Sequence, residues 1–301
     1  MTHRLASACV AFGLAAIVSL IGCASRDMPP VPPNRLTFEQ RCADPAVVKC
    51  VGFDSPDAVD RFVYPTASTN TKRGQVVTDV KASGAGSLRF EVPSNTSADT
   101  SGTYWQNFSD DLSVQFGEGQ QFFVQWRQRF SREFLDEARG CCWKQAIIGE
   151  GDRPGVRRFS CTQLELVVTQ GDWGYPTMYH SCGAKDGHSE GLEETWRSVS
   201  YRPDQWMTFQ VQVKIGRWYR NDERYHRDST IRLWVAEEGQ PSKLVIDQTG
   251  YDLANEDPAA RYGKVWLLPY QSNKDPALRH PTGYTWYDEL IISRSRIADP
   301  A

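Results

Sequence analysis

The feature that most constrains the fold is a succession of short strand-like segments with almost no helical period between them. After residue 80, runs rich in Val, Ile, Phe, Tyr and Trp are bounded by Gly, Pro, Asn and Asp, a pattern typical of strands and their turns. The expected strands are 87–93, 121–130, 143–149, 163–168, 206–215, 229–236, 243–247, 263–270 and 284–293. Only 131–138 and 257–263 carry a short helical period. The chain is therefore expected to be all-β, an antiparallel β-sandwich of the jelly-roll kind.

Several of these strands alternate between an apolar face and a face of Arg, Gln, Lys and aromatic residues. Segment 121–130 carries Arg127 and Arg129 on its polar face, and 206–215 carries Gln210 and Gln212. For any single strand a solvated outer face is the simpler interpretation. The repeated pairing of Gln and Arg with Trp favours a concave, sugar-binding sheet, because rings stack on pyranoses while amides and guanidinium groups bind hydroxyls and carboxylates.

Residues 1–22 have the pattern of an export signal rather than of a folded segment. A short basic start precedes an apolar run that is too short for a permanent transmembrane helix. The run ends in Leu-Ile-Gly-Cys, which resembles the lipobox of bacterial lipoproteins and implies cleavage before Cys23 and lipidation of its thiol. Ala24 follows, which implies an outer-membrane address in the bacterial cell envelope. An ordinary secretory signal with an incidental cysteine is the alternative.

The rest of the chain is expected to be one domain on a tether. Residues 23–37 are rich in Pro, and such a segment is extended and semi-rigid. The folded domain should then occupy 38–301, a normal length for a large sandwich. The formal net charge of −3 argues against a nucleic-acid partner, and contact with the membrane is expected through the N-terminal lipid only. We expect a monomer.

Six cysteines remain beyond Cys23, which suits disulfide formation in an oxidising envelope. We favour the two local pairs Cys42–Cys50 and Cys161–Cys182. That choice leaves Cys141 and Cys142 to pair with each other. Sequence alone permits 15 pairings of six cysteines. A zinc site is the rival interpretation, but the paired CxxC spacing of zinc sites is missing and His180 next to Cys182 is a weak signal.

Three segments carry a resemblance to a known superfamily: "WMTFQVQVKIG", "STIRLWVAEEGQP" and the closing "YTWYDELIISRSRI". Together they resemble the concanavalin A-like lectins and glucanases. Within that superfamily the chain is most similar to the jelly-roll polysaccharide lyases, the heparin lyase I-like and alginate lyase groups, over about residues 50–297. The resemblance implies a protein that acts on an acidic, uronate-containing polysaccharide by β-elimination. It implies no cofactor, although a structural calcium ion is compatible with it.

The alginate lyases of that group carry an Arg-rich strand, a Gln-x-His strand and a late Tyr-x-Lys strand. The matching segments here are "WRQRF", "WKQAI" and "YGKVWLLPYQ". Ile147 stands where the family has its His, so a participating His would come from elsewhere, with His180 and His280 the candidates. The expected catalytic residues are Arg127, Gln145, Tyr270 and His280. The expected substrate-binding residues are Arg129, Lys144, Gln210, Gln212, Lys264, Gln271, Lys274, Trp173 and Tyr179.

The chemistry explains why such residues would gather. A lyase removes the proton at C5 of a uronate and expels the 4-O-linked sugar, so the charge that develops at the C6 carboxylate must be neutralised by Arg, Lys or amides. A Tyr takes the C5 proton or protonates the leaving oxygen, although a phenol near pKa 10 needs cations beside it to act as a base. Two other interpretations stay open. One is a lectin-like module without chemistry, and the other is a glycoside hydrolase, for which no run of alternating acids is present.

Overall fold

The computed structural model describes most of the chain from Arg35 onward. The described ranges are 35–60, 74–94, 104–137, 143–159, 161–162, 164–171, 174–181, 190–192, 195–218, 226–253, 255, 257–271, 275–277 and 279–301. The chain divides into two compact units, Met1–Pro30 and Val31–Ala301. The first unit, with the expected signal segment and Cys23, lies outside the described residues, so the second alone is discussed below.

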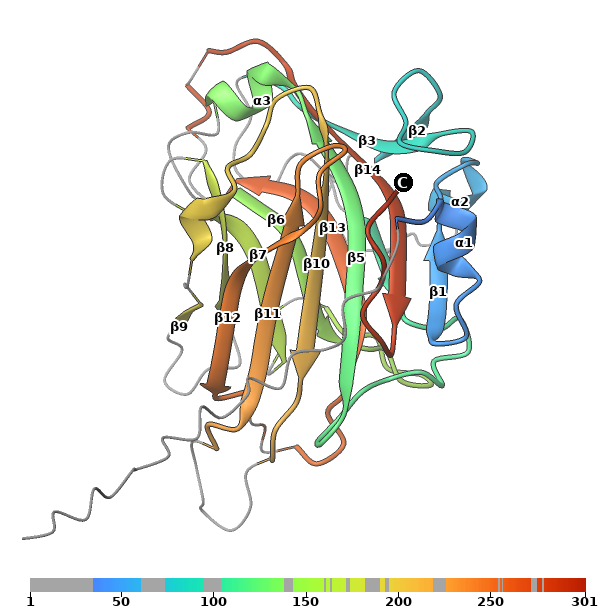
Figure 1. Cartoon of the computed structure of the whole chain (residues 1–301), viewed down its shortest axis with the longest axis vertical. Helices are drawn as coiled ribbons and strands as arrows, with labels where there is room; N and C mark the ends of the chain where they lie inside the picture. The colour runs from blue at the N-terminus through green and yellow to red at the C-terminus, as the bar shows by residue number, and fades with distance from the viewer. Residues whose placement is uncertain are drawn as a thin grey trace, which may run out of the picture. The chain divides into compact units, whose positions relative to one another are not determined.

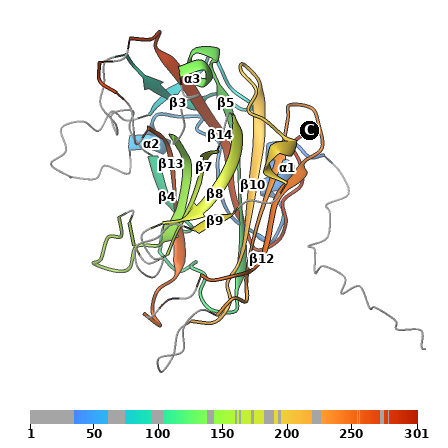
Figure 2. The ribbon, with the colours of Figure 1, turned by 90° about the vertical axis from the view of Figure 1, so that its left-hand side faces the viewer.

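The second unit is a sandwich of two antiparallel sheets, which confirms the predicted fold class (Figures 1 and 2). The eight-stranded sheet runs in the order β12-β11-β10-β5-β14-β3-β2, and β1 also pairs with β14. Its strands are β1 (Val47–Val51), β2 (Gln75–Val77), β3 (Ser87–Val92), β5 (Gln121–Phe130), β10 (Trp206–Lys214), β11 (Ser229–Ala236), β12 (Lys243–Tyr251) and β14 (Gly283–Ser293).

The six-stranded sheet runs in the order β4-β13-β6-β7-β8-β9. Its strands are β4 (Tyr104–Asn107), β6 (Trp143–Glu150), β7 (Glu165–Gly171), β8 (Tyr175–His180), β9 (Glu190–Leu192) and β13 (Tyr262–Gln271). Figure 2 shows β4, β13, β7 and β8 in one layer, beside a second layer that holds β5, β14 and β10.

The core lies between the two sheets and is built by alternation. Phe122, Val124 and Trp126 of β5 are fully buried in it, together with Ile148 of β6 and Val168 of β7. The apolar face predicted for segment 121–130 is therefore the inner face of the sandwich. The same alternation assigns the opposite side chains of each strand to an outer face.

Within the described ranges, four short helices lie beside the strands: α1 (Phe38–Cys42), α2 (Asp57–Asp60), α3 (Arg132–Glu137) and the 3₁₀ turn η3 (Trp196–Ser198). The helix predicted for 131–138 is confirmed by α3. The helix predicted for 257–263 is wrong, because the Asp257 carboxylate accepts the Ala259 N–H in a tight turn and β13 begins at Tyr262. In the described part of the chain no helix is both long and apolar enough to cross a membrane.

Candidate functional site

The structure divides the predicted site residues between the two sheets. Arg127 and Arg129 lie on β5, and Gln210 and Gln212 lie on β10, all in the eight-stranded sheet. A second group belongs to the six-stranded sheet: Lys144, Gln145, Tyr179, Lys264, Tyr270 and Gln271. Arg127 and Tyr270 therefore do not share a sheet face. Trp173, Lys274, Cys141, Cys142 and Cys182 lie outside the described residues.

Gln210 and Gln212 are buried rather than exposed to a ligand. The Gln210 amide donates to the Ile297 carbonyl at 3.0 Å and accepts the Ile297 N–H at 2.8 Å, so it fastens the C-terminal segment to the sheet. Gln212 bonds to Gln121 and Arg232, each at 3.2 Å. The prediction that these amides line an open sugar-binding face is therefore not supported by their contacts. Helix α1 and the C-terminal segment cover that part of the sheet and form a small apolar cluster with its outward side chains.

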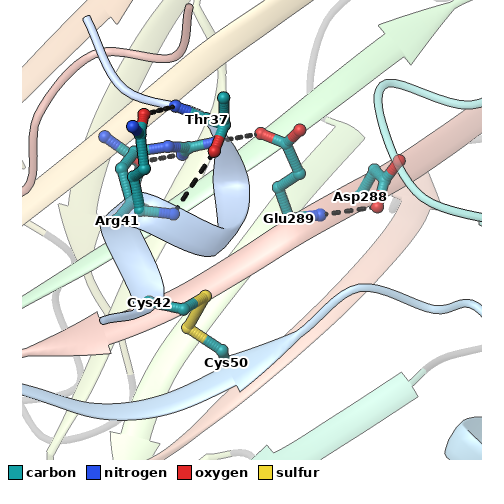
Figure 3. Close-up of a disulfide and its surroundings, with 8 residues drawn as sticks. Thr37, Arg41, Cys42, Cys50, Asp288 and Glu289 are labelled. Carbon is teal, nitrogen blue, oxygen red and sulfur yellow. Dashed lines mark hydrogen bonds and ion pairs between the residues drawn. A yellow bond between two sulfur atoms is a disulfide. The ribbon is translucent and has the colours of Figure 1, made fainter. Parts of the chain in front are cut away.

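Arg127 belongs to a buried ionic network under α1. Its guanidinium lies 3.6 Å from a Glu289 carboxylate oxygen and 3.9 Å from Glu238. Arg41 of α1 forms an ion pair with the same Glu289 (Figure 3). Arg41 also donates to Gln125 at 2.5 Å. The Cys42–Cys50 disulfide ties α1 to β1 beside this network, as predicted. Cys161 is also disulfide-bonded, to a partner outside the described residues.

Gln145 points into the sandwich and not onto its outer face. Its Oε1 accepts a hydrogen bond from the Tyr201 hydroxyl at 2.8 Å, and the side chain is fully buried. The cause is a bulge: the register of β6 against β7 shifts between Lys144 and Ala146, so Gln145 and Ala146 do not alternate. Gln145 is therefore not placed where it could touch a substrate.

The two histidines considered from sequence lie apart from the other candidates. His180 is buried, and its ring packs edge-on against Tyr251 of the core, with 6.4 Å between centroids. The His280 backbone N–H donates to Ser94 at 3.1 Å, and its ring nitrogen lies 2.6 Å from the Pro281 carbonyl. These contacts hold His280 within the segment that precedes β14.

The outer face of the six-stranded sheet carries a separate apolar cluster. Trp105, Trp266, Ile147, Val167 and Tyr179 stand in one row across five strands, since each is the register partner of the next. Leu268 and Tyr270 complete this group, which we call the outer cluster. Ile147 fills the position of the family's histidine and packs here as an apolar residue.

The accessible end of the outer cluster holds a lysine and two tyrosines. Lys144 is the register partner of Tyr270, and its ammonium lies 4.9 Å from the centre of the Tyr270 ring. Lys144, Tyr179 and Tyr270 are all partly exposed, unlike the tryptophans. Their charges and ring faces are thus available to a ligand. We call these three residues the Lys144 group.

Two pKa shifts describe the electrostatics of this end. Burial, with the nearby Glu165 and Tyr270, raises the pKa of Tyr179 to about 12, so this phenol is protonated at neutral pH. Burial also raises the pKa of Glu165, opposed by the hydrogen bond from the Cys161 N–H and by the charge of Lys144. The outer face of the sheet therefore combines a cation, a phenol that holds its proton and, within electrostatic reach of both, the Glu165 carboxyl group. Glu165 is a lone acid in "QLELVV", so the sequence carries no signal that marks it as a site residue.

The other end of the cluster is closed. Lys264 is fully buried between the rings of Trp105 and Trp266, with 4.5 and 5.3 Å to their centres. It forms an ion pair with Asp152 and donates to the Arg158 carbonyl at 2.7 Å. Burial lowers the pKa of Lys264, opposed by its bond to Asp152. Lys264 thus fastens the segment after β6 to the sheet, a structural position instead of the expected substrate contact.

A cavity of about 650 Å³ lies elsewhere, between β1 and β4. Lys49, Asp57, Gln106, Asn107 and Asp110 are among its lining residues. None of the residues predicted to be catalytic or substrate-binding lines it. Among the described residues no group of three or more His, Cys, Asp or Glu side chains is suited to hold a metal ion.

Comparison with known proteins supports the fold. No protein-family model matches the chain, and no curated protein matches it. A PL-14 alginate lyase from Aplysia kurodai has a similar structure, with a TM-score of 0.58 and 11% identity over 82% of this chain and 99% of that chain. At this identity the likeness shows a shared jelly-roll fold.

Two further structures are more distant. Alginate lyase vAL-1 from Chlorella virus has a TM-score of 0.43 and 12% identity, over 73% of this chain and 89% of that chain. The catalytic domain of a glycoside hydrolase family 131 protein from Coprinopsis cinerea has a TM-score of 0.41 and 13% identity, over 85% of this chain and 98% of that chain.

Proposed function

We propose that this domain is a polysaccharide lyase that cleaves an acidic, uronate-containing polysaccharide by β-elimination at the Lys144 group. The observation that carries the proposal is the ammonium of Lys144 at 4.9 Å from the Tyr270 ring, on a partly exposed patch that also holds Tyr179. A cation on one phenol, with a second phenol in the same cluster, is suited to a reaction in which a carboxylate must be neutralised while a proton leaves and another arrives. The shared fold with an alginate lyase makes alginate the first substrate to test.

Each residue has a distinct role in this proposal. Lys144 neutralises the C6 carboxylate of the uronate, which acidifies the proton at C5. Tyr270, as phenolate, takes that proton, and the electron pair of the C5–H bond forms the C4–C5 double bond. The C4–O4 bond breaks, and Tyr179 donates its proton to the departing O4. The raised pKa of Tyr179 suits the donor role, because the phenol still holds its proton at neutral pH.

The test is turnover of a panel of polyuronates: alginate, glucuronan, pectate and heparin. The unsaturated product absorbs in the ultraviolet, so the initial rate is read directly. Tyr270→Phe and Lys144→Gln are each expected to lower kcat by about 10²-fold or more, because each removes a proton acceptor or a charge from the transition state. Tyr179→Phe should lower kcat in the same way.

Tyr284→Phe is the matched control. Tyr284 of β14 lies 5.4 Å from the Arg89 guanidinium, a comparable cation and ring pair in the other sheet, and its loss should leave turnover unchanged. Full activity in both Tyr270→Phe and Lys144→Gln would reject the Lys144 group as the catalytic site.

A lectin-like module is the second candidate, favoured by one observation. Ile147 packs in the outer cluster at the position where the lyase resemblance expects a histidine. Retention of the domain on an immobilised polyuronate, without unsaturated product from any member of the panel, would support this candidate over the lyase.

We also propose that the domain is a lipid-anchored protein of the bacterial envelope, on the support of the Leu-Ile-Gly-Cys segment that ends at Cys23. A Cys23→Ser variant should leave the membrane fraction and fail to incorporate labelled palmitate. Unchanged fractionation and labelling would refute the anchor.

A further inference from the structure

We infer that residues 151–159, the arm that follows β6, form a second contact site for the acidic polysaccharide, with Arg157 and Phe159 as the residues that touch it. This inference rests on the proposed function, because it takes the same substrate class. It adds a binding site at the opposite end of the sheet from the Lys144 group.

The arm is the most exposed apolar part of the described chain. Val156 is 45% exposed and Phe159 is 48% exposed, and they are the large hydrophobic residues that stand out on the surface of the described part. Single exposed apolar residues are common on proteins. Here two of them occur within four positions, and Arg157 lies exposed between them. Apolar exposure of this kind, combined with charge, marks a contact surface.

The charges of the arm suit a polyanion. Arg153, Arg157 and Arg158 lie within six positions of one another, and Arg157 among them is exposed. Arg153 contacts Glu150 at 3.4 Å and Asp257 at 3.2 Å, and Arg158 lies 3.8 Å from Glu150. Guanidinium groups match carboxylates in shape and charge, and an aromatic ring stacks on the apolar face of a pyranose.

The arm is held rigidly, which lowers the entropic cost of binding. Arg153 and Val156 exchange two backbone hydrogen bonds, at 2.9 and 2.8 Å. Asp152 accepts the Arg158 N–H at 2.7 Å and a bond from Asn107 at 2.9 Å, and Lys264 donates to the Arg158 carbonyl. This network explains why the chain keeps a lysine fully buried on an outer face. The lysine positions the arm.

The arm and the Lys144 group lie at opposite ends of one strand. Lys144 and Glu150 lie six positions apart along β6, which corresponds to about 20 Å at the rise of an extended strand. Only a ligand several sugars long can contact both. The arm is therefore expected to strengthen the binding of polymer and to contribute little to the chemical step.

The test measures binding and turnover separately. Arg157→Ala and Phe159→Ala are each expected to weaken the binding of polymeric alginate roughly three- to tenfold. The corresponding rise should appear in KM, with kcat unchanged. Phe159→Trp keeps an aromatic ring at this position, so it should bind polymeric alginate as tightly as the wild type does. The control is Arg294→Ala. Arg294 is exposed on the turn after β14, so this substitution removes the same charge from the other sheet. Unchanged thermal unfolding confirms that the variants fold.

The outcomes separate the two proposals. Normal turnover with unchanged affinity and KM in Arg157→Ala and Phe159→Ala would overturn the arm and leave the lyase intact. Weakened polymer binding in those variants, with no turnover of any polyuronate by the wild type, would support the arm and reject the lyase. A wild type that binds none of the panel would overturn both.

Discussion

At the scale of single residues, Asp288 shows how burial sets the behaviour of an acid. Its carboxylate is fully buried on β14 and accepts N–H groups from Ala82 at 2.8 Å, Ser83 at 3.3 Å and Glu289 at 2.7 Å (Figure 3). Burial nevertheless raises the pKa of Asp288 to about 7. The desolvation of the charged form outweighs the three hydrogen bonds.

The raised pKa of Asp288 predicts a pH dependence of stability. Because the folded state holds the proton more tightly than the unfolded state, the stabilisation is complete below the unfolded pKa, near 3.9, and is lost as the pH rises through about 7. Asp288 should thus lower the free energy of unfolding by about 2–3 kcal/mol between pH 5 and pH 8. Chemical denaturation of wild type and Asp288→Asn over that range measures the effect. Parallel pH profiles of the two proteins would contradict it.

Residue-level alternation predicted some side-chain directions and missed others for one physical reason. On β5 the alternation is unbroken, and Phe122, Val124 and Trp126 point inward as expected. On β6 the bulge next to Lys144 changes the phase, so Gln145 turns inward and Lys144 outward. A bulge depends on pairing with distant strands and leaves no clear mark in a single sequence.

At the scale of elements, length decided what sequence could predict. The long apolar strands were found, and β5 and β11 have the predicted bounds. The strands β1, β2, β4, β8 and β9 were missed, since each has only three to six residues, too few for a reliable period. The failure to predict β4 and β8 matters most, because β4 brings Trp105 to the outer cluster and β8 brings Tyr179.

The order of the strands in each sheet could not be predicted from the sequence, for a related reason. Strand β5 pairs with β10 and β14, which follow it by many residues, and β13 pairs with β4 and β6. Such pairing is a property of the closed sandwich and not of any local pattern. Sequence therefore identified Arg127, Lys144 and Tyr270 as chemically suited residues, while their division between two sheets became evident only in three dimensions.

At the scale of the whole molecule, the two outer faces of the sandwich differ in how far they are covered. The eight-stranded sheet has α1 and the C-terminal segment packed on its outer face, where charged groups such as Arg127, Arg41 and Glu289 are buried in pairs. The six-stranded sheet keeps the Lys144 group partly exposed. Buried pairs stabilise the fold when both partners are present, whereas exposed cations are available to ligands.

This contrast predicts opposite outcomes for one arginine substitution in the eight-stranded sheet and one lysine substitution in the six-stranded sheet. Arg127→Ala removes a partner of the buried Glu289, so we expect the free energy of unfolding to fall by about 1–3 kcal/mol, because Arg41 still neutralises that carboxylate. Its kcat/KM on a polyuronate should stay unchanged. Lys144→Ala should lose turnover while its unfolding midpoint stays near that of the wild type, because Lys144 is partly exposed. Measuring both quantities for both variants decides which face is catalytic. Loss of turnover in Arg127→Ala alone, at unchanged stability, would move the reaction to the eight-stranded sheet.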